Sequence, residues 1–594
     1  MEQSHYYRLA KALNNPESPG IPVQVTIEQL SELLCCTPRN VKFILRKLED
    51  QELIAWKPGR GRGHLSSLTF FRSTDDMVEE NFRDLLNKGK IKEVIELIRT
   101  SAAGNLLRDR LMTELTRHMG FRSDPASSSG KDVLRMMRGR VLERLDPAFV
   151  FTAFEAYIIG QVCSTLVVYN AAEDRFSPGL SHTWEHNADY TVWTFYLRKG
   201  VRFHHDGQLT AKDVKYTLER LLQLDSPSLW QFRELKEVRT SGDYTVSFCL
   251  EKPNRFFLHT AACLYMSILP HDVGLSEIPV GTGPFRVSEM NEDVLVLTAF
   301  DSYYGIRPLL DRVEIWFFLE HAGSDRRYEV AGEESPVQEL MSWNQYNSSI
   351  DYPALGCRYI MINFGREGVH HRIEVRQALR HLYDREAIIR ELGGSRYKPA
   401  DSLLPQISRE RDIPEGSLQT AKELLMQAEY AGEPVTFAFT TKKEEMEEAE
   451  WLHARARSIG LNLVLVPLSS RDSRMDMVDA DLLLAEEVLE DDWEWGMLNF
   501  YQNDQKSLRQ MLHPAAKEAL NQALENVFQL KTYERFNRIR EAESLVRDNL
   551  WMLYTCHLNK KAKLSDSLLG RHTGSFGFLD ISRLWVKNTG AKET

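Results

Sequence analysis

In this sequence of 594 residues, the basic residues between positions 37 and 64 have types and spacing that indicate a definite chemistry. Arg39, Lys42 and Arg46 recur at spacings of three and four, so they would share one face of a helix. More basic residues follow in the glycine-rich segment KPGRGRGH, residues 57–64. Guanidinium and ammonium groups gathered on one surface attract phosphate oxygens, so the pattern indicates a surface that binds a polyanion.

The charge balance separates this segment from the rest of the chain. Residues 36–72 contain eight Lys and Arg residues and three acidic residues, a net charge of +5. The whole chain has a formal charge of −11, so the remaining residues together carry −16. We therefore expect duplex DNA to bind this segment and not the rest of the protein. The alternative is a small structural domain whose basic residues are merely solvated.

The elements around the basic residues predict a winged helix-turn-helix domain over residues 1–73. Thr26 begins one helix, with Gln29 at the capping-box position, and Thr37 begins a second, with Pro38 in its first turn. The second helix has an apolar stripe opposite its basic face, made of Val41, Ile44, Leu45 and Leu48.

Two strands complete this expected domain. Leu53–Trp56 and Leu65–Phe71 flank the glycine-rich loop and would form a hairpin with a basic tip. The glycines lack Walker or dinucleotide-binding spacing, so a wing tip that follows the phosphate backbone is expected instead. The residues expected to contact DNA are Thr37, Arg39, Asn40, Lys42, Phe43, Arg46, Lys57, Arg60, Arg62 and His64.

Residues 74–130 are expected to join this domain to a larger one. Apolar residues recur at helical spacing between Asp75 and Met119, and Ser123–Lys131 has the composition of a flexible linker. We interpret the helices as a connector packed on the winged helix. A dimerisation element is the alternative, so the sequence leaves a homodimer open.

The larger domain is organised around Val192–Leu222, which predicts a strand, a tight turn and a capped helix. Gly207 is expected to supply any positive φ in the turn, and Thr210 to cap the helix. His204 and His205 are adjacent, and in a strand they would face opposite sides, so they do not predict a metal site.

Catalytic chemistry has little support in the sequence. There is no GxSxG, HExxH or P-loop pattern, and the seven cysteines have neither CxxC spacing nor a nucleophile signature. We therefore expect a binding protein that is not an enzyme and has no cofactor and no metal.

The order of several motifs resembles the family-5 solute-binding proteins of peptide and nickel transport systems. The matching segments are LRKGVRFHHDGQLTAKDV (197–214), GTGPF (281–285), MINF (361–364) and the helices around VRQAL (375–379) and DREAI (384–388). The resemblance implies a bilobed α/β domain like the periplasmic binding proteins over residues 131–590. Lobe I would comprise roughly residues 131–320 and 550–590, and lobe II residues 321–549. Residues 321–352 depart from the family pattern, so the solute is open.

The same resemblance implies a solute-binding region. Asp481–Glu487 and the acidic loop that follows resemble the strand and loop that line the family's cleft. Aromatic side chains can form apolar walls there, and acids can fix polar ends of a ligand. The candidate ligand-binding residues are Asn363, Glu487, Asp491, Trp493 and Trp495. A solvated acidic loop with two packing tryptophans is an equally weighted alternative.

The first residues show no pattern of a secretory signal, and no run of about 18 apolar residues occurs. We expect a cytoplasmic protein without a membrane span. A winged helix before a family-5 domain resembles the transcriptional regulators of the sugar-phosphate-stress type, most closely in GRGRGHLSSLTFF (59–71) and RVLERLDPA (140–148). The resemblance implies a regulator that binds operator DNA and senses a sugar phosphate or peptide-like solute. The alternative is a solute-binding receptor for a peptide/nickel-type ABC transporter.

Overall fold

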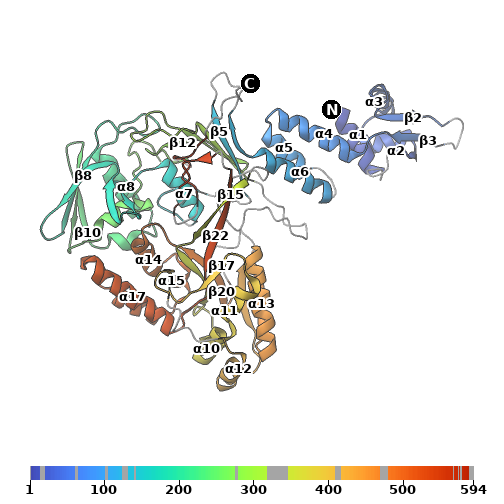
Figure 1. Cartoon of the computed structure of the whole chain (residues 1–594). Helices are drawn as coiled ribbons and strands as arrows, with labels where there is room; N and C mark the ends of the chain where they lie inside the picture. Colours follow the sequence, from blue (N-terminus) through green and yellow to red (C-terminus); the bar gives the residue numbers. More distant parts are fainter. Residues whose placement is uncertain are drawn as a thin grey trace. The chain divides into compact units, whose positions relative to one another are not determined.

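The computed structural model divides the chain into two compact units, Met1–Met119 and Gly120–Thr594, each described by itself (Figure 1). The residues described are 2–13, 20–59, 65–100, 105–123, 131–138, 142, 144–150, 152–274, 278–317, 346–408, 416–468, 479–565, 568–572, 574 and 578–586.

The first unit begins with the expected winged helix-turn-helix. Its elements are α1 (Glu2–Ala12), β1 (Pro22–Val25), α2 (Ile27–Leu34), α3 (Pro38–Asp50), β2 (Ile54–Lys57) and β3 (Ser66–Phe70). The strands form an antiparallel sheet in the order β1-β3-β2. The predicted helix pair and hairpin are therefore confirmed, whereas α1 and β1 were not predicted.

Local hydrogen bonds explain where the two central helices begin. Thr26 Oγ1 accepts a bond from the Gln29 amide at 3.1 Å, and Gln29 Oε1 accepts one from the Thr26 amide at 2.9 Å. Thr37 Oγ1 accepts a bond from the Asn40 amide at 3.4 Å. These oxygens satisfy backbone donors that have no partner within the first turn of a helix. Between the helices, Cys35 takes a left-handed conformation with φ of 52°.

Helix α1 closes the core of the winged helix. Tyr6 is 0% exposed and packs edge-on against Phe70, with ring centroids 5.3 Å apart. Its hydroxyl donates to the Arg72 carbonyl at 2.5 Å, which ties α1 to the end of the wing. The predicted stripe of Val41, Ile44, Leu45 and Leu48 is buried in the same core.

Three further helices, α4 (Thr74–Asn87), α5 (Ile91–Thr100) and α6 (Asn105–His118), complete the first unit. They pack on one another, and α4 also contacts α1. Their apolar positions are buried within the chain: Phe82, Leu86, Ile91, Val94, Ile95, Ile98, Leu107, Leu111 and Leu115. Because this stripe is already covered, it is not available to a second subunit, and the arrangement favours the connector interpretation.

The second unit begins earlier than the predicted residue 131. Strand β4 (Gly120–Ser123) pairs antiparallel with β5 (Asp132–Arg138), so it belongs to the larger unit. Residues 124–130 of the predicted linker lie outside the described residues. The predicted boundary missed β4 because a four-residue strand leaves almost no periodic signal.

Two sheets form most of the first lobe. One has the order β12 (Phe285–Met290), β13 (Val294–Ala299), β14 (Arg312–Phe317), β5 and β4, and the other has the order β10 (Leu235–Ser241), β11 (Thr245–Leu250), β9 (Val192–Leu197) and β8 (Ser181–His186). A small ladder joins β6 (Val167–Asn170) and β7 (Arg175–Pro178). The helices are α7 (Ala153–Val162), α8 (Ala211–Gln223) and α9 (Phe257–Ala262).

The second lobe is built on a mixed sheet with the order β19 (Leu463–Leu468), β18 (Val435–Thr440), β20 (Leu482–Val488), β16 (Gly356–Ile362) and β21 (Met552–Tyr554). Its helices are α10 (Ile373–Leu382), α11 (Arg385–Leu392), α12 (Leu418–Gln427) and α13 (Lys443–Ile459). The segment that follows β20 contains α14 (Trp493–Gln502), α15 (Ser507–Met511), α16 (Pro514–Ala523) and α17 (Thr532–Asp548). The bilobed α/β architecture implied by the sequence is confirmed.

Two long strands run between the lobes, β15 (Tyr346–Pro353) and β22 (Cys556–Ser565), which pair antiparallel (Figure 1). β22 also pairs with β17 (Arg396–Pro399). The predicted lobe I range of 550–590 is therefore wrong in its first part, because residues 552–565 pair with strands of the second lobe. Phe578, Leu579, Ile581 and Leu584 do pack in the core of the first lobe. Of the divergent segment 321–352, residues 318–345 lie outside the described residues.

The turn after β9 differs in detail from the prediction. Asp206, and not Gly207, has the positive φ, of 68°. A Cβ on Gly207 would lie 2.5 Å from the ring of the exposed His205, so a larger residue there would require that ring to move. His204 and His205 lie in a loop, so the strand argument about their directions does not apply.

His204 has a structural role in that loop. Its Nε2 donates to the Gly283 carbonyl at 3.0 Å, and its Nδ1 accepts from the Gly281 amide at 3.3 Å. Burial lowers the pKa of His204 to about 4, which agrees with a neutral ring held by these two bonds.

The GTGP turn allows two backbone segments to approach closely. A Cβ on Gly281 would lie 2.1 Å from the Val162 carbonyl oxygen, and one on Gly283 would lie 2.5 Å from the Val162 carbonyl carbon. Neither glycine has a positive φ, so the requirement is for space and not for backbone conformation.

We expect Gly281→Ala to destabilise the second unit by about 1–3 kcal/mol, because the added methyl group must displace the end of α7. Gly274→Ala is the matched control, since a Cβ there meets nothing within 4 Å. Chemical denaturation of both variants measures the difference. Equal free energies of unfolding would show that the close approach is not rigid.

Candidate nucleic-acid interface and solute-binding region

Helix α3 presents a basic face to solvent. Arg39, Asn40, Lys42 and Arg46 are exposed, opposite the buried apolar stripe. Among the residues that the structure describes, no carboxylate pairs with Arg39, Lys42 or Arg46. Cationic groups without internal partners are available to phosphates and to base edges.

Phe43 lies on the same face and is 58% exposed. The Lys47 ammonium lies 5.0 Å from the centroid of its ring. An exposed aromatic residue among basic ones can make apolar contact with a thymine methyl group in the major groove. Thr37 is also exposed, but its hydroxyl already caps α3, so its first role is to fix where this helix begins.

The hairpin of β2 and β3 is fixed to α3. Glu49 Oε1 of α3 accepts a hydrogen bond from the Trp56 amide of β2 at 2.7 Å. Lys57, at the end of β2, is exposed. Arg60, Arg62 and His64 lie outside the described residues, so their predicted roles stay predictions.

The acidic loop between β20 and α14 forms the second candidate region. Asp492 caps α14, where its Oδ1 accepts a bond from the Trp495 amide at 3.2 Å. Its Oδ2 lies 2.7 Å from Nδ1 of His259, which belongs to α9 in the first lobe. Lys506 Nζ donates to Glu487 Oε1 at 2.7 Å, and Arg535 Nε donates to Glu494 Oε2 at 2.7 Å. Several of the carboxylates in and beside this loop therefore have a hydrogen-bond or ion-pair partner within the chain.

The structure separates the predicted ligand residues by role. Trp495 is 1% exposed, and its indole donates to Gln231 Oε1 at 3.0 Å, so it packs between elements. Trp493 is half-buried and meets Phe536 edge-on, with ring centroids 5.6 Å apart. Asp491 is exposed, and Glu487 pairs with Lys506.

Asn363 does not join this group. It is 8% exposed, its amide donates to the Ala480 carbonyl at 2.8 Å, and its Oδ1 accepts from the Gly365 amide at 3.0 Å. It lies beside Asp481, where β20 begins, whereas Glu487 lies near the end of that strand. Six residues of strand separate the two ends by roughly 20 Å.

Glu490 is a residue that sequence reasoning missed. It is half-buried beside Asp491 and Asp492, and burial together with these carboxylates raises its pKa to about 8. His259 and Gln231 were also missed, because they contact the loop across more than 200 residues of sequence. An acidic run was the only signal for Glu490, and no local signal marked the other two.

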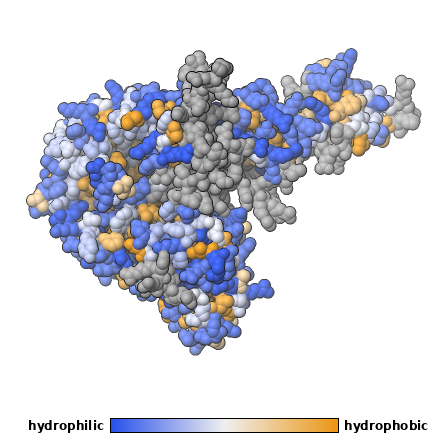
Figure 2. Space-filling view, in the orientation of Figure 1, coloured by the Kyte–Doolittle hydropathy of each residue, from blue (hydrophilic) through white to orange (hydrophobic). Residues whose placement is uncertain are grey.

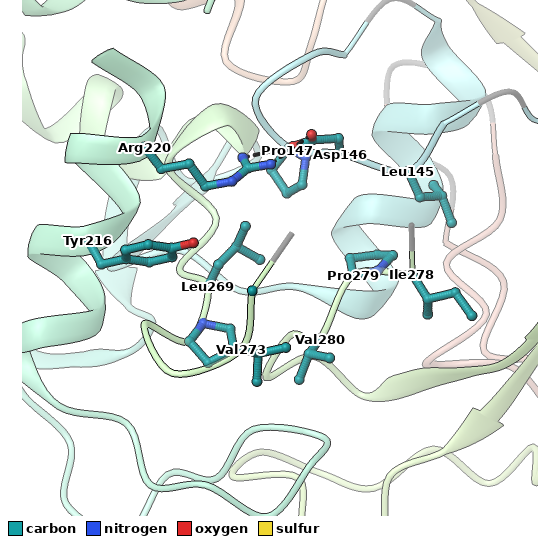
Figure 3. Close-up of a pocket in the computed structure, with 12 residues that line it drawn as sticks. Leu145, Asp146, Pro147, Tyr216, Arg220, Leu269, Val273, Ile278, Pro279 and Val280 are labelled. Carbon is teal, nitrogen blue, oxygen red and sulfur yellow. Dashed lines mark hydrogen bonds and ion pairs between the residues drawn. The ribbon is translucent and has the colours of Figure 1, made fainter. Parts of the chain in front are cut away.

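A cavity in the first lobe is too small for a solute. It is lined by the sides of Tyr216, Arg220, Leu269 and Val280, among others, and has a volume of about 40 Å³ (Figure 3). Arg220 closes one side through a bidentate pair with Asp146, with N–O distances of 2.9 and 2.8 Å. The volume suits one or a few waters, whereas pockets for small molecules usually reach ~300 Å³ or more.

Hydrophilic residues predominate on the face of the second unit in Figure 2, and apolar residues are scattered over it. Within the described ranges, no three His, Cys, Asp or Glu side chains are placed to hold a metal ion. No described helix is long and apolar enough to cross a membrane.

Comparison with protein families gives two matches. Residues 175–513 match the model of the bacterial extracellular solute-binding proteins, family 5, middle part. Residues 2–121 match the model of the N-terminal part of the sugar transport-related sRNA regulator. The second match covers the whole first compact unit, α4 to α6 included.

Comparison with individual proteins agrees. An uncharacterized protein, YhjP, of Bacillus subtilis (strain 168) is 28% identical over 590 residues, which cover 98% of this chain and 99% of that protein. The HTH-type transcriptional regulator SgrR of Yersinia enterocolitica is 30% identical over 305 residues, which cover 51% of this chain and 52% of the regulator. The dipeptide binding protein of Pseudoalteromonas sp. SM9913, solved with Met-Leu, superposes with a TM-score of 0.66 at 19% identity, over 77% of this chain and 100% of that one.

We expect Glu490 to make stability fall as the pH rises from about 5 to 8. Its folded pKa is about 8 and its ordinary pKa is 4.5, so in this window only the unfolded chain loses the proton. Glu490→Gln removes this effect. The melting temperature of the variant should therefore gain on that of the parent as the pH rises.

The control for this prediction is Glu525→Gln, which removes an exposed carboxylate from the same region of the sequence. Thermal unfolding of the three proteins at pH 5, 6.5 and 8 gives the comparison. Parallel curves for the parent and Glu490→Gln would contradict the raised pKa.

Proposed function

The chain belongs to the family-5 bacterial solute-binding proteins and has an N-terminal regulator domain, and from this premise we propose that it is a transcriptional regulator. The winged helix binds operator DNA, and the bilobed domain senses a small solute. The function requires binding at two sites and no reaction. Because it acts on the chromosome, the proposal places the protein in the cytoplasm.

The observation that carries this proposal is the exposed basic face of α3, whose cations have no carboxylate partner among the described residues. The alternative, a structural domain with solvated basic residues, would explain why the segment is basic. It would not explain why Arg39, Lys42 and Arg46 gather on one face of α3, opposite its buried apolar stripe. The Glu49–Trp56 bond holds the wing next to that helix, which gives the module two adjacent basic surfaces. The alternative of a transport receptor gives this unit no role and is less well supported.

For the solute we propose the region around the loop from Glu487 to Trp493. Asp491 and Trp493 supply an exposed carboxylate and a partly exposed ring, and the buried Trp495 holds the loop in place. Asn363 is better explained as a residue that fixes the chain between β16 and β20. The solved relatives suggest a small polar or peptide-like solute, and a sugar phosphate is a second class to test.

We expect the full-length protein to bind duplex DNA from upstream of its own gene with strong salt dependence. If about four phosphates are contacted, the slope of log affinity against log salt should be about −3 to −4. Arg46→Ala should weaken binding by roughly 1–3 kcal/mol without changing the melting temperature, because the side chain is exposed.

Two further variants make that result interpretable. Leu45→Ala should destabilise the first unit by about 2–5 kcal/mol, because this neighbouring side chain is buried. Lys212→Ala removes an equal charge from the exposed side of α8 and should leave DNA affinity unchanged. Fluorescence anisotropy and thermal unfolding measure both quantities. Salt-independent association, or equal effects of Arg46→Ala and Lys212→Ala, would count against the interface.

The regulator proposal also predicts reciprocal coupling between the two sites. A solute that changes DNA affinity must itself bind with an affinity changed by the same factor when DNA is present. The coupling should be about 1–3 kcal/mol, or about 5- to 150-fold. Calorimetric titration of short peptides and sugar phosphates, with and without operator DNA, measures it. A solute that binds identically in both conditions would leave the solute site standing and refute the coupling.

A further inference from the structure

A second and larger cavity lies in the second lobe, away from the acidic loop. Its volume is about 400 Å³, which is within the range of small-molecule sites. Its walls come from α10, α11, the loop after β17, α17 and β21. The labels of α10, α11, β17 and α17 locate this part of the lobe in Figure 1. Neither the proposed solute region nor the DNA-binding face contributes to it.

Four guanidinium groups line this cavity: Arg380, Arg385, Arg540 and Arg547. Arg540 and Arg547 lie seven residues apart on α17, with Glu543 and Ser544 between them on the same face. Arg380 lies on α10, and Arg385 is the first residue of α11. Arginines from three helices thus line one polar space.

Three of these arginines have no anionic partner within the described part of the chain. Arg380 forms no ion pair there, and its buried Nε has no hydrogen-bond partner. Arg385 is buried and donates only to the Ala400 carbonyl, at 2.9 Å. Arg540 contacts the ring of Phe536, at 5.9 Å. A charge withdrawn from water without a counter-ion is costly, so these arginines favour an anion in the cavity.

The acidic residues of the cavity do not fill this need. Glu543 is buried and accepts bonds from Ser402 Oγ and the Leu403 amide, both at 2.9 Å. Burial raises its pKa, which favours the neutral acid. Asp548 is exposed and pairs with Arg547 at 3.3 Å. The charge of Asp401, the third, acts to raise the pKa of Arg385, but burial outweighs it and the pKa is lowered.

The pKa values of two of these arginines are lowered. Burial, and then the charge of Arg380, lowers the pKa of Arg385 to about 10. Burial also lowers the pKa of Arg380. Both directions are those of cations that lack a partner, and a bound anion would reverse them.

We propose that this cavity binds a small molecule that carries a phosphate group, held by Arg380, Arg385 and Arg540. A guanidinium matches the oxygens of a phosphate bidentately, and a dianion neutralises more than one arginine at once. Ser544 and the nearby carboxylates can hydrogen-bond hydroxyl groups on the rest of the ligand. A dicarboxylate has related chemistry and is the competing ligand class.

The test uses the full-length protein with inorganic phosphate as the probe, and succinate and potassium chloride of equal ionic strength as the other arms. Phosphate should raise the melting temperature of the parent more than either. Calorimetry should show the affinity for phosphate reduced on the order of ten- to hundred-fold in Arg540→Gln, the loss expected for a charge-assisted hydrogen bond. Arg538→Gln, two residues away on α17 and outside the cavity, should bind as the parent does.

Arg380→Gln separates a binding role from a structural one. Without phosphate it should melt no lower than the parent, because it removes an uncompensated charge, and it should lose the stabilisation by phosphate. An arginine needed only for packing would lower the melting temperature and leave the response to phosphate intact. Equal stabilisation by phosphate and chloride, or a stronger response to succinate, would overturn the proposal. None of these readouts depends on DNA binding.

Discussion

Two buried tryptophans connect the lobes of the second unit, and the candidate solute region depends on them. Trp495 of α14 donates to Gln231, and Trp230 of the first lobe donates to Asn499 of α14 at 3.2 Å. The ring centroids of the two tryptophans lie 6.0 Å apart. Each indole N–H thus finds its acceptor on the opposite side of the contact, which a buried donor requires. This reciprocal pair fixes α14, and α14 in turn fixes the acidic loop before it. The carboxylates of that loop can therefore be held in one arrangement although several would repel one another.

Much of the N-terminal unit could be predicted because its signals are local. Thr26, Gln29 and Thr37 act within four residues of themselves, and the apolar stripe of α3 repeats at the period of its own helix. Helix α1 was not predicted because its amphipathic pattern is short. The first residues were compared only with the pattern of a secretory signal. Its role in the core depends on contacts of Tyr6 with Phe70 and Arg72, which lie 64 and 66 residues away in the sequence.

The solute-binding domain could be predicted as a fold from its motif order, but its site could not be predicted in detail. The motifs predict β20, which the structure confirms, whereas nothing local shows that His259 contacts Asp492 or that Lys506 balances Glu487. Asn363 was predicted with the acidic loop but lies near the start of β20, at the other end of that strand. A sequence motif identifies the residue but does not show which end of the strand lies near a ligand. The arginine cavity combines residues from positions 380 to 554, and no spacing in the sequence indicates it.

The return of the last part of the chain to the first lobe affects the order in which the protein can fold during synthesis. The first unit is complete after Met119, and the sheet of the second lobe draws on residues 356–554 only. The core of the first lobe, by contrast, includes Phe578, Leu579, Ile581 and Leu584, which leave the ribosome hundreds of residues after its other strands. A nascent chain can therefore fold its DNA-binding unit early, while the first lobe waits for its last apolar residues. Chaperones that shield exposed apolar surface would have their longest engagement with that waiting lobe.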